Sequence, residues 1–281
     1  MCRSLTTLTI VAILAFLTSC STLNKMMDGD RPTAAVKGVS LEGLSLDGAD
    51  LVFDVEIGNP YDVPLPLLGI DYELAHATKK FLSGRSDEGG TIPARRSRVI
   101  PLKTHVQFAS LVALASDVKP GSVVDYVADI GLTVDAPVLG QLRLPLQKQG
   151  EVPIPNVPRI SVDGIQWKEL SLTRAAAAMN LSIENTNDFP IDLQDLLYQL
   201  KLGGMSVAES RVTEGVKFGK GESQSMQINF GLKPSDLGLA AFRMLTGSGA
   251  GYELTGDMDL ATPFGPLKLP YDAKGQTGFS R

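Results

Sequence analysis

Cysteine is almost absent from this chain of 281 residues, which contains only Cys2 and Cys20. Both lie near the N-terminus, so the rest of the sequence can form no internal disulfide and no thiolate metal site. Histidine is equally scarce, with only His76 and His105, and tryptophan occurs once. Catalytic sets that need several thiols or imidazoles are excluded, and we expect no enzyme active site, no metal and no cofactor.

Charge of one sign is not concentrated anywhere in the sequence. Lys and Arg number 26 against 31 Asp and Glu, a net charge of −5, and there is no basic block. We therefore expect no nucleic-acid partner. Apolar residues make up 43% of the chain, which is typical of a globular protein and not of a disordered one.

Long hydrophobic runs are also missing, apart from residues 5–17, which follow Arg3. That run is too short to span a bilayer with ordinary flanks. It ends in Leu17-Thr18-Ser19-Cys20, which resembles the lipobox of bacterial lipoproteins. The resemblance implies a cleaved signal peptide at 1–19 and lipid attachment, palmitate included, at Cys20. A generic signal peptide or an uncleaved anchor is the alternative.

The lipid at Cys20 would make the membrane a partner, since each buried methylene adds about 0.8 kcal/mol of binding free energy. Ser21 follows the cysteine, where an aspartate would resemble an inner-membrane retention signal. We therefore expect a location in the bacterial cell envelope, on the outer membrane and facing the periplasm.

The sequence after the leader contains a long repeat. Residues 57–65 reappear as residues 183–191, an offset of 126 (183 − 57), and the same register continues to Pro137 and Pro263. Upstream, residues 39–44 match residues 160–165 at an offset of 121, which predicts five extra residues near 175–178. A period this long indicates a duplicated domain. We expect a tether at 20–36, domains at 37–152 and 159–281, and a stiff proline-rich linker at 153–158.

Alternating hydrophobicity predicts strands in both copies. Leu51, Phe53, Val55 and Ile57 share one face, and residues 177–183 of the second copy keep that parity. The alanines at 175–178 would suit a helix, but a helix would break the parity. Further strands are expected at 70–74, 99–106, 124–134, 141–146, 196–200, 225–232, 252–260 and 267–270.

One helix is expected in each copy. Phe108, Leu111, Val112, Ala115 and Val118 recur at helical spacing in the first. In the second, residues 237–245 do so behind Ser235 and Asp236, which resemble N-terminal caps. Many short strands and one α-helix per copy predict a mainly β protein with two tandem antiparallel β-sandwich domains.

The first copy carries a motif that supports this fold. Asn59-Pro60-Tyr61, followed by Pro64-Leu65-Pro66 and Tyr72, resembles the water stress and hypersensitive response (WHy) domain of the late embryogenesis abundant (LEA) type 2 family. The second copy keeps Asn185, Phe189 and Pro190 but has Thr186 in place of the proline. We expect the motif residues to be structural, with Tyr61 covering the sheet.

The resemblance implies immunoglobulin- or fibronectin III-like sandwiches and a role in tolerance of water stress, with no enzymatic residues to transfer. It also brings a suggested role in lipid binding or transfer, through a groove between sheet and helix.

The remaining candidates for chemistry are weak. Both histidines lie in the first copy, and Gly231 takes the place of His105 in the second, whereas a duplicated active site would keep its base. Asp257, Asp259 and the Asp87-Glu88 pair could contact a cation, but no loop supplies the six to eight oxygens that Ca²⁺ prefers. We expect both histidines and these carboxylates to be solvated, and Trp167 to be buried.

Three functions remain open at this stage. The first is a non-catalytic, membrane-anchored envelope lipoprotein that protects lipids or client proteins during desiccation. The second is a carrier that binds or transfers a lipid or another hydrophobic ligand, which requires a continuous apolar cavity. The third is an envelope scaffold subunit, whose sheet edges would recruit a partner by strand addition.

Overall fold

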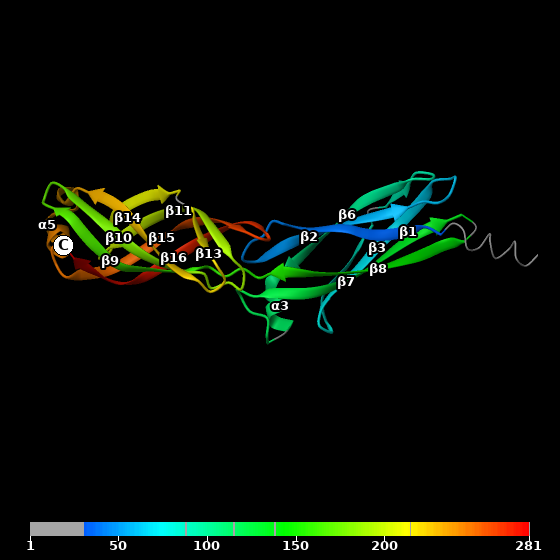
Figure 1. Ribbon diagram of the computed structural model, residues 1–281, viewed down its shortest axis with the longest axis horizontal. Coiled ribbons are helices and arrows are strands. Elements are labelled where there is room, and N and C mark those ends of the chain that lie inside the picture. The colour runs from blue at the N-terminus through cyan, green and yellow to red at the C-terminus, as the bar shows by residue number, and fades with distance from the viewer. Residues whose placement is uncertain (1–30, 88, 115, 138, 214, 281) are drawn as a thin grey trace, which may run out of the picture.

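The computed structural model describes residues 31–280 apart from 88, 115, 138 and 214. The leader, Cys20 and most of the expected tether lie outside these residues, as do Glu88 and Ala115. Within the described part, no helix is long and apolar enough to cross a membrane. Figure 1 shows two β-rich domains placed end to end along the longest axis of the molecule.

The first domain is built from two antiparallel sheets. One has the order β1-β2-β6 and the other the order β4-β3-β7-β8, with β5 beside β3. The helix α3 follows β6. The bounds are β1 Thr33–Glu42, β2 Gly48–Gly58, β3 Leu65–His76, β4 Lys79–Ser86, β5 Gly90–Ile92, β6 Ser97–Gln107, α3 Phe108–Leu114, β7 Val123–Ala136 and β8 Gly140–Pro153.

The second domain repeats this plan in one eight-stranded sheet, β12-β11-β15-β16-β9-β10-β14, with β13 beside β11. The sheet is continuous because β16 pairs in parallel with β9. The bounds are β9 Arg159–Leu170, β10 Ala175–Glu184, β11 Ile191–Leu202, β12 Met205–Val212, β13 Val216–Phe218, β14 Ser223–Leu232, α4 Pro234–Leu237, α5 Leu239–Leu245, β15 Gly249–Thr262 and β16 Gly265–Ser280. The predicted fold class, mainly β with two tandem domains, is confirmed.

The alternation that predicts the strands corresponds to the observed burial. Phe53, Val55 and Ile57 on β2 are fully buried, and Leu51 is almost so. On β10, the alanines extend as a strand and not as a helix, and Ala177, Met179 and Leu181 face the core. Small side chains suffice there because Trp167 lies opposite Ala177 on β9.

The predicted upstream register is wrong, because the offset of 126 also holds there. β1 pairs Leu41 with Leu51, and β9 pairs Trp167 with Ala177. The following turns agree: the Ser45 hydroxyl bonds to the Gly48 backbone, as the Ser171 hydroxyl bonds to the Arg174 backbone. No five-residue insertion exists at 175–178. Gly164 corresponds to Gly38 and not to Gly43: Gly38 pairs with Asp54 and Gly164 pairs with Asn180, each next to a bulge in its strand.

Three other boundaries differ from the sequence expectation. β1 begins at Thr33, inside the expected tether, and β8 continues to Pro153, inside the expected linker. The second helix is divided at Gly238, whose φ of 87° is incompatible with a right-handed helix. Ser235 and Asp236 do not cap it, because the N-cap of α4 is Lys233 and proline occupies the first turn.

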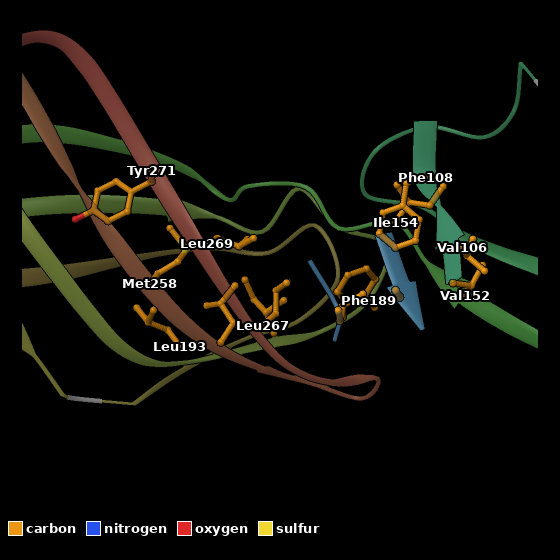
Figure 2. Close-up of a cluster of buried hydrophobic side chains, with 14 of the residues drawn as sticks. Val106, Phe108, Val152, Ile154, Phe189, Leu193, Met258, Leu267, Leu269 and Tyr271 are labelled. Atoms are coloured by element: carbon orange, nitrogen blue, oxygen red, sulfur yellow. The ribbon is translucent and has the colours of Figure 1, made fainter. Parts of the chain in front are cut away.

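The linker is packed between the domains. Val152 and Ile154 are almost completely buried, and so are Pro153, Pro155 and Pro158. Figure 2 shows Ile154 beside Phe108 at the end of the first domain, with Phe189 of the second domain on the other side of the junction. All belong to one continuous core cluster that extends through both domains. The connection is therefore a buried element of structure.

Candidate functional site

The Asn59 side chain organises the turn that follows β2. Its Nδ2 donates to the carbonyl oxygens of Val63 at 2.9 Å and Ile92 at 3.0 Å, with Pro93 at 3.1 Å. Its Oδ1 accepts from the Tyr61 N–H at 2.9 Å. Asn59 is only 4% exposed, so this amide satisfies main-chain groups that water cannot easily reach.

Asn185 does the same after β10. Its Nδ2 donates to Phe189 O at 2.8 Å and Gly219 O at 2.9 Å, and its Oδ1 accepts from the Asn187 N–H at 3.0 Å. The side chain is fully buried. The asparagine therefore makes the same turn-stabilising hydrogen bonds in both copies, and the proline is not needed for them. This explains why Thr186 can stand in the place of Pro60.

The residues that depart from the motif in the second copy bind the linker. The Asn156 N–H donates to Oδ1 of Asn187 at 2.7 Å, and Nδ2 of Asn187 donates back to Asn156 O at 3.0 Å. Nδ2 of Asn156 donates to Oγ1 of Thr186 at 3.1 Å, and that hydroxyl donates to Val157 O at 3.3 Å. We call Asn156, Thr186 and Asn187 the asparagine clamp.

Main-chain contacts and aromatic packing extend the same junction. The Asp188 N–H donates to Gly121 O at 2.7 Å, and the Gly121 N–H donates to Ile154 O at 2.7 Å. Gly121 has a φ of 93°, and a Cβ there would lie 2.6 Å from Thr186 O, so a glycine is required. The ring of Phe189 meets that of Phe264, at the tip of the β15–β16 hairpin, edge to face at 5.5 Å.

Open clefts lie where this hairpin tip meets the first domain. One, of about 850 Å³, is lined by His76, Asp125, Tyr126, Glu151 and Phe264 among others. Nδ1 of His76 donates a hydrogen bond to the main-chain carbonyl oxygen of Asp125, 2.7 Å away, and its Nε2 lies 3.6 Å from Oδ2 of Asp117. The walls are mixed in polarity and the cleft is wide, so it lacks the enclosure expected for a specific small-molecule site.

The interior of the first sandwich is filled by its own side chains. Phe53 contacts Tyr126 edge to face at 6.3 Å, and Phe108 and Leu111 on α3 are buried in the same core. Val112, which belongs to the apolar pattern that predicts this helix, is 37% exposed, because only one side of the short helix is covered. Burial raises the pKa of Tyr126 to about 12.

The second sandwich is equally closed between the two halves of its continuous sheet. The space among Ile160, Ile183, Leu193, Phe218 and Met258 does not admit a water molecule. Trp167 is 5% exposed, as expected, and packs edge-on against Phe230 and Phe279 at centroid distances of 6.2 and 5.8 Å. A carrier needs an open apolar interior, and these packed regions do not provide one.

The chain matches the family model of the late embryogenesis abundant protein LEA_2 over residues 54–150 and again over residues 180–275. It belongs to this family. The two LEA_2 matches occupy equivalent parts of the two domains, and each contains the asparagine that organises its turn, Asn59 or Asn185.

Relatives of the LEA_2 chain include plant proteins whose names refer to desiccation. The desiccation protectant protein Lea14 homolog of Glycine max is 31% identical over 47% of this chain and 88% of its own length. A desiccation-related protein of Arabidopsis thaliana is 32% identical over 47% of this chain and 80% of its own. A solution structure of a late embryogenesis abundant protein shares 29% identity over 54% of this chain and 87% of that one, with a TM-score of 0.40.

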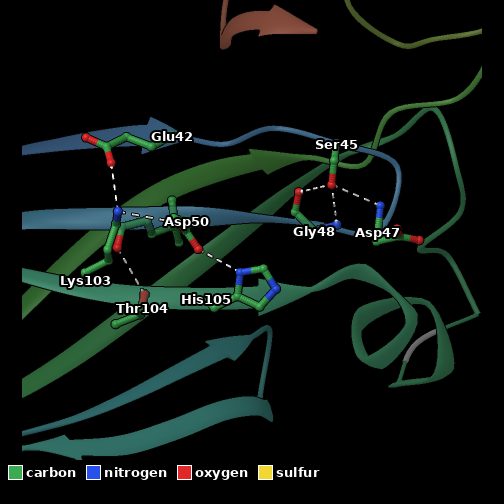
Figure 3. Close-up of polar contacts among 9 residues, drawn as sticks. Glu42, Ser45, Asp47, Gly48, Asp50, Lys103, Thr104 and His105 are labelled. Atoms are coloured by element: carbon green, nitrogen blue, oxygen red, sulfur yellow. Dashed lines mark hydrogen bonds and ion pairs between the residues drawn. The ribbon is translucent and has the colours of Figure 1, made fainter. Parts of the chain in front are cut away.

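Charged side chains cover the outer face of β1, β2 and β6 in the first LEA_2 domain. Figure 3 shows Lys103 between Glu42, at 3.1 Å, and Asp50, at 3.7 Å, while His105 bonds to Asp50 at 2.7 Å. The hydrogen bond to Glu42 raises the pKa of the exposed Lys103. In the second domain, Asp259 lies 3.7 Å from Lys268.

These groups pair with one another at the surface, and His105 is well exposed, as expected for a solvated histidine. Among the described residues, no three His, Cys, Asp or Glu side chains gather in a way that could hold a metal ion.

Proposed function

We propose that this LEA_2 chain is a non-catalytic protectant of the bacterial cell envelope, anchored through lipid at Cys20 and acting when water is lost. The observation that carries the proposal is the pair of family matches, together with relatives whose names refer to desiccation. The filled interiors of the sandwiches agree with action through the outer surface. The partners would be neighbouring envelope proteins and lipids.

The protective activity is tested by drying a labile enzyme with and without the purified protein and measuring the activity recovered on rehydration. We expect recovery above that given by an equal mass of serum albumin. Equal recovery would contradict the proposal. A parallel assay of fluorescent fatty-acid binding addresses the carrier alternative: saturable binding by the wild type would favour a carrier instead.

The anchor and its location are tested through Cys20. Cys20→Ser should abolish the incorporation of labelled palmitate in a bacterial host and release the protein from the outer-membrane fraction. Cys2→Ser is the matched control and should leave both unchanged. Labelling of the Cys20→Ser protein would contradict the assignment, because the lipid would then be attached elsewhere.

A further inference from the structure

The loops at one end of the first LEA_2 domain lie beside the start of β1. Thr33, the first residue of β1, pairs with Gly58 at the end of β2, so the turn after β2 lies at this end. The Arg95 N–H donates to Tyr61 O, which brings the turn before β6 to the same place. The β7–β8 turn is here too, because the end of β7 pairs with the start of β3. We call residues 31–33, 59–64, 93–98, 137, 139 and 140 the outer end, since it faces away from the second domain (Figure 1).

The second copy uses its equivalent end as a contact surface. Val63 corresponds to Phe189, and Leu139 and Phe264 each precede the glycine of their hairpin turn. Phe189 is 3% exposed and meets Phe264 edge to face where the second domain packs on the first. At the outer end, by contrast, Val63 is 48% exposed and Leu139 is 51% exposed. The outer end is therefore an uncovered version of a surface that the second domain buries.

Exposed apolar side chains are concentrated at and beside the outer end. Val63 and Leu139 lie in its loops, while Val99 and Leu68 lie within the first four residues of β6 and β3 and are 49% and 39% exposed. These are four of the eight large apolar side chains that are well exposed in the part of the chain that the structure describes. One exposed apolar residue needs no explanation, but a group at one end of a domain indicates a contact with another surface.

The charge of this end differs between the two copies. The turn before β6 has the sequence Arg95-Arg96-Ser97-Arg98, and the same turn of the second copy has the sequence Gly221-Glu222-Ser223-Gln224. Arg31, just before β1, is a further exposed cation. The end that packs against protein thus has a single carboxylate where the outer end has three guanidinium groups.

Acidic side chains neutralise only part of this positive charge. Arg95 donates to both carboxylate oxygens of Asp62, at 2.8 and 3.0 Å, and Arg85 pairs with Asp87 at 3.0 Å. Arg98 donates to a carbonyl oxygen, that of Thr91, at 3.4 Å. Among the described residues, Arg31, Arg96 and Arg98 form no ion pair, and the exposed Asp135 is the remaining acid of these loops. Unpaired guanidinium groups beside exposed apolar side chains suit the headgroup region of an anionic bilayer.

The chain before the outer end ties it to the proposed lipid anchor. Cys20 and Arg31 are separated by eleven residue steps (31 − 20), and such a segment spans at most about 40 Å. A lipid on Cys20 would therefore keep the outer end close to the bilayer surface. Weak intrinsic affinity is enough at that range, because a tether of this length gives an effective concentration of about millimolar.

We propose that the outer end docks on an anionic phospholipid bilayer, with Arg31, Arg96 and Arg98 on headgroup phosphates and Val63 and Leu139 in the interfacial layer. Docking in this way directs the second domain away from the membrane, since that domain lies at the other end of the molecule (Figure 1). The inference rests on the proposed function, because it says which surface of the anchored protein meets the lipid. It is distinct from carriage of a lipid, since the ligand is the bilayer surface and the sandwich interiors stay filled.

The test uses the mature chain from residue 20 with Cys20→Ser, which lacks the leader and the lipid but keeps every described residue. Flotation with vesicles of equal parts phosphatidylglycerol and phosphatidylethanolamine should show binding that weakens as salt is raised. Vesicles of phosphatidylcholine alone should bind at least about tenfold more weakly. Equal binding to the two kinds of vesicle, or no binding to either, would overturn the proposal.

Charge reversal tests the arginines. Arg96→Glu together with Arg98→Glu should weaken binding to the anionic vesicles at least about tenfold. Lys233→Glu together with Arg243→Glu is the matched control, because it makes the same change in net charge at exposed positions around α4 and α5, at the opposite end of the molecule. Thermal melting checks that both double variants fold. An equal loss in the two would mean that net charge and not the outer end governs binding.

A fluorescent probe tests which end meets the lipid, and it needs no charge-reversal variant. The mature Cys20→Ser chain contains no cysteine, so one can be introduced and labelled at a single position. An environment-sensitive fluorophore on Leu139→Cys should shift its emission to shorter wavelength when the anionic vesicles are added. The same fluorophore on Leu239→Cys, at a position that is 66% exposed on α5, should not shift. A shift at residue 239 and none at residue 139 would contradict the docking of the outer end.

The inference and the proposed function fail in distinguishable ways. Palmitate labelling that depends on Cys20, without vesicle binding by the unlipidated chain, would overturn the docking proposal alone. Vesicle binding with the expected variant pattern, without labelling at Cys20, would overturn the anchor and leave the docking surface standing. Concentration-dependent self-association in the absence of lipid, abolished by Leu139→Glu, would assign the outer end to a second copy of the chain and overturn the docking proposal.

Discussion

Replacing Asn187 with alanine should uncouple the two domains. The side chain accepts from the Asn156 N–H at 2.7 Å and donates to Asn156 O at 3.0 Å, and it is 2% exposed. Each hydrogen bond contributes about 1 kcal/mol net, and leaving the two linker groups poorly solvated adds about 1 kcal/mol more. We expect a loss of about 3 kcal/mol from the interaction between the domains, a large part of a typical stability.

Scanning calorimetry is the measurement for this prediction. The wild type should unfold in one cooperative transition, whereas Asn187→Ala should show two, because each domain then melts on its own. Asn156→Ala removes only the bond to Thr186 and should cost about 1 kcal/mol. Asn180→Ala, on the exposed face of β10, should stay within about 0.5 kcal/mol of the wild type. A single transition in Asn187→Ala at the melting temperature of the wild type would refute the prediction that the asparagine clamp couples the two domains.

Three further predictions concern the first domain. Phe53→Ala should cost about 3–5 kcal/mol in urea unfolding, because a fully buried ring is lost, while Leu68→Ala should cost far less. Asn59→Ala should cost about 3 kcal/mol by the same assay, since it orphans buried main-chain groups; a cost under 1 kcal/mol would mean that water replaces the amide. Between pH 10 and 12 the unfolded chain releases the Tyr126 proton before the folded protein does, so the contribution of Tyr126 to the free energy of unfolding should fall by about 1.4 kcal/mol per pH unit. Tyr126→Phe should lessen that fall, and an unchanged slope would contradict the burial argument.

The sequence was sufficient for the features that depend on local periodicity. The parity of Leu51 to Ile57 and the repeat at an offset of 126 led to two mainly β domains, because a strand that buries one face must alternate. The asparagine motif can be recognised in the sequence, but the sequence does not say which of its residues holds the turn. Only the structure shows that the Asn59 amide makes the decisive bonds.

Features that depend on tertiary packing were missed. Three prolines suggested a stiff connector, yet Ile154 is buried because both domains pack on it. Asn187 stands where the first copy has Tyr61, and nothing in its own sequence neighbourhood pairs it with Asn156, 31 positions away. A comparison of the two repeats would identify Asn187 as a candidate for a contact between the domains, because it lies at a buried turn and differs from the equivalent residue of the first copy.

When the two domains are expressed separately, their boundaries should follow the structure and not the boundaries expected from the sequence. A first half at 37–152 would lack the first four residues of β1 and the buried Ile154, whereas 31–155 retains both. We expect the longer version to melt at a higher temperature in circular dichroism.

The position of Trp167 makes the two domains optically distinguishable. It is the sole tryptophan of the chain, and it packs against Phe279, on the part of β16 that closes the second repeat. Its emission therefore reports the release of that strand from β9, while the first domain can unfold without changing the indole's surroundings. In a variant whose domains unfold separately, such as Asn187→Ala, tryptophan emission and a signal that covers the whole chain, such as circular dichroism, can follow the two domains in one unlabelled sample.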